Sequence, residues 1–192
     1  ADTIGLLASR LRQARERLAG RRRGPRPGAP RVEAVFENAV AMTAPPEHLQ
    51  LEPGTKTTLR GELGRVLDHC NRVSGGALLI AAADLLGSTS VATGSKAFPA
   101  GFWNRQTNPE ARLIAIGGIC EDAISGVMSG LSSYGHHIGV GSSYAAFIAP
   151  LGHIAARLHA IGNQARQALQ PGPYRPYILV LGHAGLKTGE DG

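Results

Sequence analysis

Polar side chains follow four apolar segments of this chain, each within a few residues of the segment's end. They are Asp84, Glu121, the pair Ser142 and Ser143, and His183. Carboxylate, hydroxyl and imidazole groups are side chains that move protons and bind polar ligands. If the four segments are parallel strands of one sheet, their carboxyl ends meet at one edge, where ligands bind in such folds. The spacing predicts one site built from four strand ends and leaves the reaction undetermined.

Each of these residues also has a purely structural interpretation. Asp84 can cap a turn, and Glu121 stands where acidic side chains favour the first turn of a helix. His183 can be a hydrogen-bonded structural histidine. His136 and His137 have no nearby carboxylate or cysteine partners at ligand spacing, so we expect no metal site there.

The hydrophobic pattern predicts the elements that would position these side chains. Apolar runs without alternation are typical of strands covered on both faces, and the chain has four, at 77–83, 112–117, 137–141 and 176–182. Helices are expected before and between these runs, at 57–73, 121–132 and 145–161. Strands that alternate with helices need crossover connections, so the predicted fold is α/β, a mostly parallel sheet with helices on both faces.

The positive charge is concentrated in the first 32 residues, which hold nine Arg and two acidic residues, a net charge of +7. Residues 33–192 hold eleven basic and twelve acidic side chains, so this part is close to neutral. Residues 4–18 have helical spacing of leucines, and 20–30 read as a Pro/Gly/Arg linker. We therefore divide the chain into a basic helical and linker segment, 1–32, and one domain, 33–192. No aromatic side chains interleave the arginines to stack on bases, so we expect a connector; a nucleic-acid-binding arm is the alternative.

Length and composition exclude several protein classes. The chain has 192 residues, 43% of them hydrophobic and 18% charged, which supports one core and excludes a disordered chain or a disulfide-stapled miniprotein. The run 77–83 is shorter than the roughly 20 residues that span a membrane. Arginines interrupt any secretory signal, so we expect a cytoplasmic protein. Cys70 and Cys120 can pair or stay reduced, because their separation matches neither a zinc nor a redox motif.

Five sequence blocks between about residue 57 and residue 192 carry a more specific pattern. In the first, Gly117-Gly-Ile-Cys precedes Glu121, which opens a predicted helix. The others are His183-Ala-Gly-Leu-Lys-Thr running into Gly189-Glu-Asp-Gly192, Gly141-Ser-Ser-Tyr-Ala-Ala-Phe147 followed by Arg157-Leu158, Asp84-Leu85 with Ser88, and Arg60 in the preceding helix. In order and spacing these blocks resemble the central, pyrimidine-binding region of transketolases, where an arginine-glutamate-histidine triplet opens the corresponding helix.

The resemblance implies a thiamine diphosphate-binding fold and a role for each matched residue. Glu121 matches a catalytic glutamate that hydrogen-bonds a ring nitrogen of the cofactor's aminopyrimidine and favours the imino form, which takes the thiazolium proton. Burial favours the protonated, donating form of such a carboxyl group. Tyr144 and Phe147 match residues that pack on the pyrimidine ring. Asp84 matches a residue near the middle portion of the cofactor.

The remaining matches imply contacts to substrate. His183, also implied as catalytic, and Asp191 match residues that hydrogen-bond the hydroxyls of the donor sugar. Arg60 and Ser88 match a phosphate-binding pair, for which a guanidinium and a hydroxyl are suited. The implied reaction is the transfer of a two-carbon ketol unit between sugar phosphates.

The family holds the diphosphate and a divalent cation, Mg²⁺ or Ca²⁺, with a glycine-aspartate-glycine segment that this sequence lacks. The resemblance therefore implies a separate diphosphate-binding domain, in the same or a partner chain, and a homodimeric full enzyme. We expect a central-domain fragment or a split subunit, inactive in isolation. Cys120, Asp122, Pro150 and Ala184 depart from the family pattern. Another thiamine diphosphate enzyme, similar to deoxyxylulose-phosphate synthase or pyruvate dehydrogenase, and a catalytically silent binding or assembly domain therefore stay open.

Overall fold

The computed structural model describes residues 2–20, 26–41, 43–154, 156 and 175–183. The labelled α-helices in these ranges are α1 (Thr3–Ala19), α2 (Glu33–Ala41), α3 (Leu59–Ser74) and α4 (Glu121–Tyr134). The strands of the same ranges are β1 (Leu78–Ala82), β2 (Ile138–Tyr144) and β3 (Ile178–Gly182). Short 3-10 helices lie at η1 (Glu47–Leu49), η2 (Val91–Ser95) and η3 (Ala145–Phe147).

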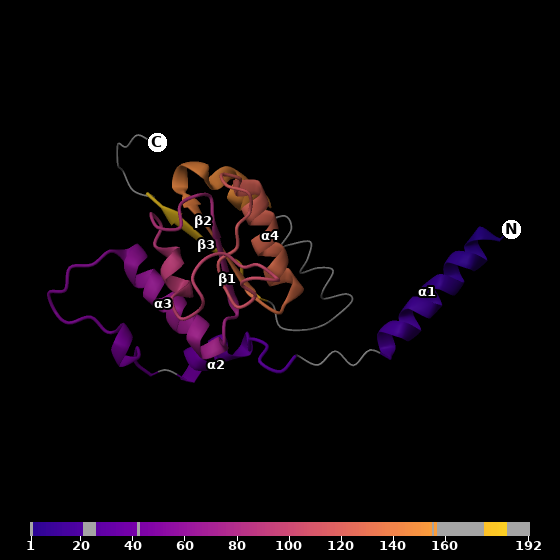
Figure 1. Cartoon of the computed structure of the whole chain (residues 1–192), viewed down its shortest axis with the longest axis horizontal. Helices are drawn as coiled ribbons and strands as arrows, with labels where there is room; N and C mark the ends of the chain where they lie inside the picture. The colour runs from indigo at the N-terminus through magenta and orange to yellow at the C-terminus, as the bar shows by residue number, and fades with distance from the viewer. Residues whose placement is uncertain (1, 21–25, 42, 155, 157–174, 184–192) are drawn as a thin grey trace.

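The three strands form a parallel sheet with β2 in the middle (Figure 1). In its register Ala82 of β1 pairs with Ser142 of β2, which pairs with Val180 of β3. Tyr144 and Gly182 form the last pair of β2 and β3. The carboxyl ends of the strands therefore lie at one edge, and the predicted α/β class with a parallel sheet is confirmed.

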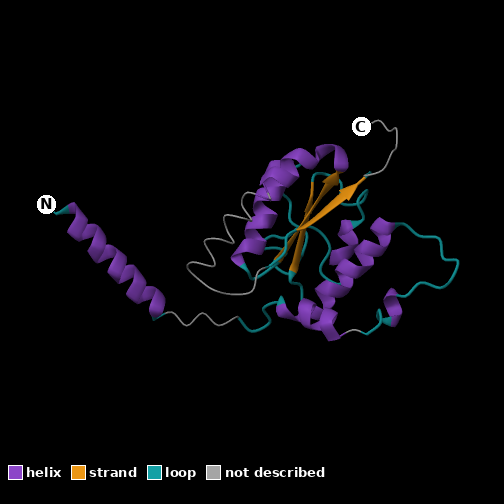
Figure 2. Cartoon of the chain, turned by 180° about the vertical axis from the view of Figure 1, so that it is seen from behind, coloured by secondary structure: helices purple, strands orange, loops and turns teal. Residues whose placement is uncertain are grey.

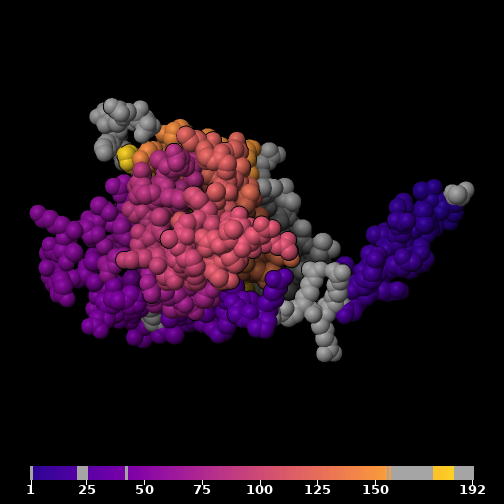
Figure 3. Space-filling model, viewed as in Figure 1, coloured from indigo at the N-terminus to yellow at the C-terminus, as the bar shows by residue number. Residues whose placement is uncertain are grey.

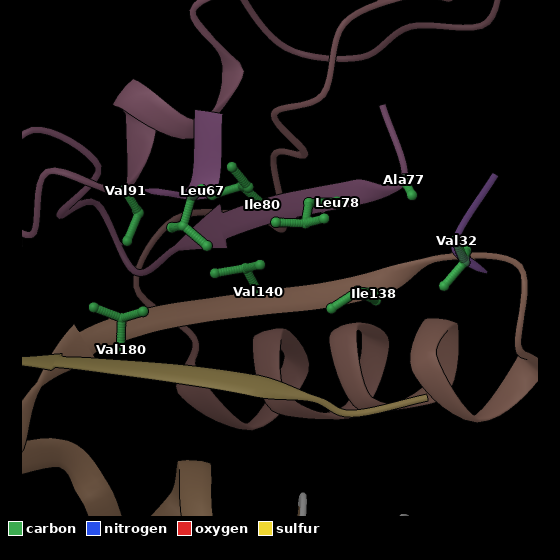
Figure 4. Packing of buried hydrophobic residues seen from close by; sticks show 9 residues of the cluster. All are labelled: Val32, Leu67, Ala77, Leu78, Ile80, Val91, Ile138, Val140 and Val180. Carbon is green, nitrogen blue, oxygen red and sulfur yellow. The ribbon is translucent and has the colours of Figure 1, made fainter. Parts of the chain in front are cut away.

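Helices cover both faces of the sheet, which lies between α3 and α4 (Figure 2). The face toward α3 and η2, here called the α3 face, carries the larger apolar cluster. Ile80 and Val140 pair across neighbouring strands and are fully buried. The buried members of this cluster are Val32, Leu67, Ala77, Leu78, Ile80, Val91, Ile138, Val140 and Val180 (Figure 4). The burial of this many aliphatic side chains is the main stabilising contribution of the fold.

The opposite side of the sheet, here called the α4 face, has a smaller apolar cluster and buried hydroxyl groups. Ile124 and Met128 of α4 pack there on the alanines of β1 and its end. The Ser132 hydroxyl accepts a 2.8 Å hydrogen bond from the backbone N–H of Gly139 in β2. A Cβ at Gly139 would overlap the Met128 carbonyl oxygen and lie 2.6 Å from its carbonyl carbon. Because Gly139 has no side chain, α4 lies directly against the backbone of β2.

The helix predicted at 57–73 is confirmed as α3, and local signals explain both of its ends. Thr58 is the N-cap, and its hydroxyl accepts a hydrogen bond from the Gly61 N–H at 3.2 Å. Gly75 ends the helix in the left-handed conformation, with φ 68°. The helix expected at 121–132 is α4, two residues longer at its C-terminal end.

Two predictions differ from the structure. The strand expected at 112–117 is reduced to isolated bridges, in which Leu113 lies beside Ile80 and Phe102. Its backbone pairs with β1 only through the hydrogen bonds that Arg112 and Ile114 form with Ile80, and the chain then turns at Gly117 and the following glycine, which have positive φ values. The helix expected at 145–161 begins as η3 and is helical over 148–154, and most of its second half lies outside the described residues.

The predicted N-terminal helix is confirmed as α1, and none of its residues is buried. It lies away from the sheet and its covering helices (Figure 1). The body begins near Val32, a member of the α3-face cluster, because the Arg31 N–H donates to the Ser74 carbonyl at 2.8 Å. In the described part of the chain no helix is both long and apolar enough to cross a bilayer. Cys70 and Cys120 are free thiols, and burial raises the pKa of Cys70.

Candidate functional site

Glu121 is the first residue of α4 and lies beside the end of the central strand. The Ser143 hydroxyl donates a 2.9 Å hydrogen bond to Oε1 of Glu121. Ser143 is fully buried, whereas Glu121 is partly exposed. No other hydrogen bond to Glu121's carboxylate is formed by the described residues. The central strand thus fixes one carboxylate oxygen of Glu121, and the other has no hydrogen-bond partner in the described part of the chain.

Tyr144 and His183 form a stacked pair of rings at the same edge. Their ring centroids are 4.2 Å apart with an interplanar angle of 21°. Tyr144 is the last residue of β2, and His183 follows directly after β3. Gly182 allows this arrangement, because a Cβ there would lie 3.1 Å from the Tyr144 ring and 3.4 Å from the methyl group of Thr89. The ring pair therefore lies against the end of β3, next to Thr89.

The acid and the rings occupy opposite sides of the central strand. Successive side chains of a strand point to opposite faces, so Ser143 faces α4 while Tyr144 faces the other side. Ser143 meets Glu121 on the α4 side. Tyr144 has Thr89, from the loop before η2, as its neighbour across Gly182 on the α3 side. The carboxylate and the stacked rings therefore flank the end of β2 from its two faces.

Arg60 and Ser88 are in contact, as their pairing in the resemblance suggests, but through the backbone. Nη1 of Arg60 donates a 2.7 Å hydrogen bond to the Ser88 carbonyl oxygen. Both residues are exposed, and Ser88 immediately precedes Thr89. The guanidinium is thereby placed on the α3 side of the same edge, and the Ser88 hydroxyl is not part of this bond.

Among the described residues, Asp84 and Phe147 are not joined to this group. Asp84 is exposed and follows β1 in the left-handed region, with φ 59°; His183 has a similar φ of 52°. Aspartate and histidine are among the non-glycine residues that most often adopt this conformation. Phe147 in η3 is 42% exposed, and no ring contact links it to Tyr144. Asp191 lies outside the described residues.

Sequence reasoning named the Ser142 and Ser143 hydroxyls as strand-end groups without assigning a partner to either. In the structure the Ser143 hydroxyl binds Glu121, whereas the Ser142 side chain points to the other face of the sheet. Ser142 is fully buried, and its hydroxyl has no hydrogen-bond partner among the described residues. Thr89, which borders the ring pair, was missed because nothing in the sequence predicts where the loop before η2 folds.

The titratable side chains of the described ranges form no group of three or more His, Cys, Asp or Glu that could hold a metal ion. The contacts described above bring the Glu121 carboxylate to one side of the strand end, and the His183 imidazole and the Arg60 guanidinium to the other.

No protein-family profile, curated protein or solved structure matches this chain.

Proposed function

We propose that the body of this chain is the pyrimidine-binding domain of a transketolase-like enzyme, which binds the aminopyrimidine of thiamine diphosphate and serves ketol transfer between sugar phosphates. The observation that carries the proposal is the position of Glu121. Its carboxylate lies at the carboxyl edge of the parallel sheet, with one oxygen held by Ser143 and the other without a partner among the described residues. Ligands of parallel α/β sheets bind at this edge.

The donor set suits an aminopyrimidine. One carboxyl oxygen is fixed, so the other can share a proton with a ring nitrogen in a defined direction. Glu121 is also the first residue of α4, so the start of the helix fixes the position of its backbone at this edge. When bound, thiamine diphosphate supplies a carbanion nucleophile, and the role of Glu121 is to hold and move the proton at the pyrimidine nitrogen.

The rings and the guanidinium extend the proposal to the rest of the ligand. Tyr144 offers a flat face at the end of β2, on the opposite side of the strand from the carboxylate, and its stacking on His183 restrains its orientation. His183 is assigned to the hydroxyls of the donor sugar, and Arg60 with Ser88 to a phosphate group. Phe147 belongs to the pyrimidine contacts by resemblance only.

Asp84 and Asp191 are assigned by resemblance alone, Asp84 near the middle of the cofactor and Asp191 to the donor sugar. The diphosphate and its Mg²⁺ or Ca²⁺ would be held by a separate diphosphate-binding domain, completing a site between subunits of a homodimer.

The proposal is tested by measuring, with calorimetry, how two compounds bind to the chain. One is hydroxymethyl aminopyrimidine, which is the pyrimidine half of thiamine, and the other is thiamine diphosphate. Glu121→Gln keeps the shape of the side chain and removes its acid group. We expect binding to weaken about tenfold or more, which is the worth of a hydrogen bond to a charged group. Asp122→Asn, one residue further in the same first turn, is the matched control and should change binding less than about twofold.

Equal losses in both variants would contradict the role of Glu121, because the effect would then follow the charge of the helix end. No binding of thiamine diphosphate even with the diphosphate-binding domain present would favour the silent binding domain. In the full enzyme, Glu121→Ala should abolish thiamine-dependent glycolaldehyde transfer, and undiminished activity would refute the assignment.

A further inference from the structure

Helix α1 is built from its own local signals and is not packed on the body. Its N-cap, Asp2, accepts a 2.9 Å hydrogen bond from the Gly5 N–H, and the helix then runs for 17 residues. No residue of α1 is buried, and the helix extends outward from the body (Figure 3). Helices in proteins gain most of their stability by packing an amphipathic face, and α1 buries none of its residues, so its apolar side chains are available to a partner.

These apolar side chains form one narrow stripe. They recur at alternating steps of three and four residues, the spacing of positions a and d in a heptad, and are Ile4, Leu7, Leu11, Ala14 and Leu18. Three of them are strongly exposed, Ile4 at 80%, Leu11 at 71% and Leu18 at 62%. We call these five residues the seam. A seam of this width packs against one further helix, since helices that lie in a membrane surface have wider apolar faces with Trp or Phe.

Arginines flank the seam on both sides. With Ile4 at position a, Arg10 and Arg17 fall at g and Arg15 at e, the positions that set partner choice in helix pairs. A second copy of α1 would place arginine opposite arginine: g meets e in a parallel pair, while e meets e and g meets g in an antiparallel one. Like charges at these positions destabilise the pair, so the seam does not suit a copy of itself.

We propose that α1 is a docking helix that binds, through its seam, an acidic helix on the surface of another protein. Charge complementarity defines this partner: its apolar residues meet the seam, and its Glu or Asp side chains lie opposite Arg10, Arg15 and Arg17. The segment holds a net charge of +7 over residues 1–32, which accelerates encounter with an acidic surface. The seam has no aromatic side chain to stack on nucleic-acid bases or to anchor in a bilayer.

The experiment uses the whole chain and a synthetic helical peptide with Ile at a, Leu at d and Glu at e and g. Binding is measured by fluorescence anisotropy at low and at high salt. Matched titrations use the same peptide with Lys at e and g, vesicles of phosphatidylcholine with phosphatidylserine, and duplex DNA. We expect the acidic peptide to bind more tightly than the other three, and its affinity to fall with salt because the flanking pairs are exposed.

Two Leu→Ser substitutions distinguish binding through the seam from binding through any exposed apolar side chain. Leu11→Ser removes a seam residue and should weaken binding about tenfold or more, whereas Leu6→Ser removes an equally apolar residue outside the seam and should leave it unchanged. Reversing Arg10 and Arg17 to Glu should shift the preference to the Lys peptide. The thermal unfolding of the body should be the same in every variant, since α1 buries nothing.

The proposal is overturned if vesicles or DNA bind more tightly than the acidic peptide. It is also overturned if the acidic peptide does not bind, if Leu6→Ser weakens binding as much as Leu11→Ser, or if the chain pairs with itself in preference to the peptide.

Discussion

The α3 face of the sheet carries the larger cluster of aliphatic side chains, whereas the α4 face combines a smaller apolar cluster with buried glycine, alanine and serine. On the first, Leu78, Ile80 and Val140 are fully or almost fully buried beneath α3 and η2. On the second, Gly139 lies directly under the backbone of α4 at Met128. The difference teaches that one face chiefly stabilises the fold, while the other holds the helix that begins at Glu121 close to the strand ends.

Substitutions on the two faces should therefore have different effects. Substitutions on the α3 face should cost stability and leave ligand binding intact once the protein is folded. Changes under α4 should affect both, because the position of Glu121 depends on how closely α4 approaches β2.

The largest loss is expected for Ile80→Ala, in the centre of the α3-face cluster. Ile80 is 0% exposed, and deleting such a side chain costs about 2–5 kcal/mol through lost burial and a residual cavity. Ile119→Ala is the matched control, because Ile119 is 74% exposed and its truncation should cost less than about 0.5 kcal/mol. Urea denaturation measures both. Similar losses for the two variants would show that Ile80 is not in a core.

Gly139→Ala comes next and tests the close approach of α4. The added methyl group would overlap the Met128 carbonyl, which is helix backbone and cannot move alone, so we expect a loss of about 1–3 kcal/mol. Gly130→Ala makes the same change within α4, where a Cβ meets nothing within 4 Å. This control should gain about 0.5–1 kcal/mol from helix propensity. If both substitutions changed the free energy of unfolding in the same direction, α4 would not pack closely on Gly139.

A smaller effect on stability is expected from pH, through the contacts that η1 and α2 make with α3. His69 of α3 shares a 3.2 Å hydrogen bond with His48 of η1 and a 2.9 Å one with Asn38 of α2. Burial lowers the pKa of His69, the charge of His48 lowers it further, and Asp68 opposes the shift. The folded chain therefore binds a proton at His69 less readily than the unfolded chain.

This contribution to stability is present above the unfolded histidine pKa, about 6.5, and is lost as pH falls from there through the lower folded value. We expect the urea concentration at the midpoint of denaturation to decrease as the pH is lowered from 7 to 5.5. His69→Gln should reduce that fall, and an unchanged pH dependence in this variant would contradict the assignment to His69. Binding of the pyrimidine probe should not depend on this substitution.

The smallest expected change in stability is for Ser143→Ala, which removes the hydrogen bond to Glu121 at a cost of about 1 kcal/mol. Its effect on ligand binding should be larger than that of Ser95→Ala, which removes the 2.8 Å hydrogen bond from the Ser95 hydroxyl to the Ala92 carbonyl in η2. A Ser143→Ala variant that binds the probe normally would mean that Glu121 needs no partner to be oriented.

The sequence predicted the elements whose signals are local. Thr58 and Gly75 mark the two ends of α3, and the uninterrupted apolar runs mark the strands, so these elements were predicted to within a few residues. The strand at 112–117 was overestimated because its apolar pattern is real but its backbone pairs with β1 only around Leu113, before the chain turns at positive-φ glycines. Backbone turning of this kind does not follow from hydrophobicity.

For the site, the sequence predicted which residue types stand at the strand ends but not which of them meet. Ser143 reaches Glu121 because strand alternation sends it toward α4, and this could have been derived once β2 was placed. The stacking of Tyr144 on His183 depends on the register of β2 with β3 and on Gly182 between them. Contacts of that kind join distant segments, and a single sequence does not specify them.

The most direct test of the proposed site is an NMR titration of the isotope-labelled chain with hydroxymethyl aminopyrimidine. The amide signals of Glu121, Ser143 and Tyr144 should shift together in a saturable way, and those of α1 should stay in place. The same titration of Glu121→Gln should need about tenfold more ligand. Shifts that cluster away from the strand ends, or an unchanged titration in Glu121→Gln, would contradict the claim that this carboxylate binds the pyrimidine.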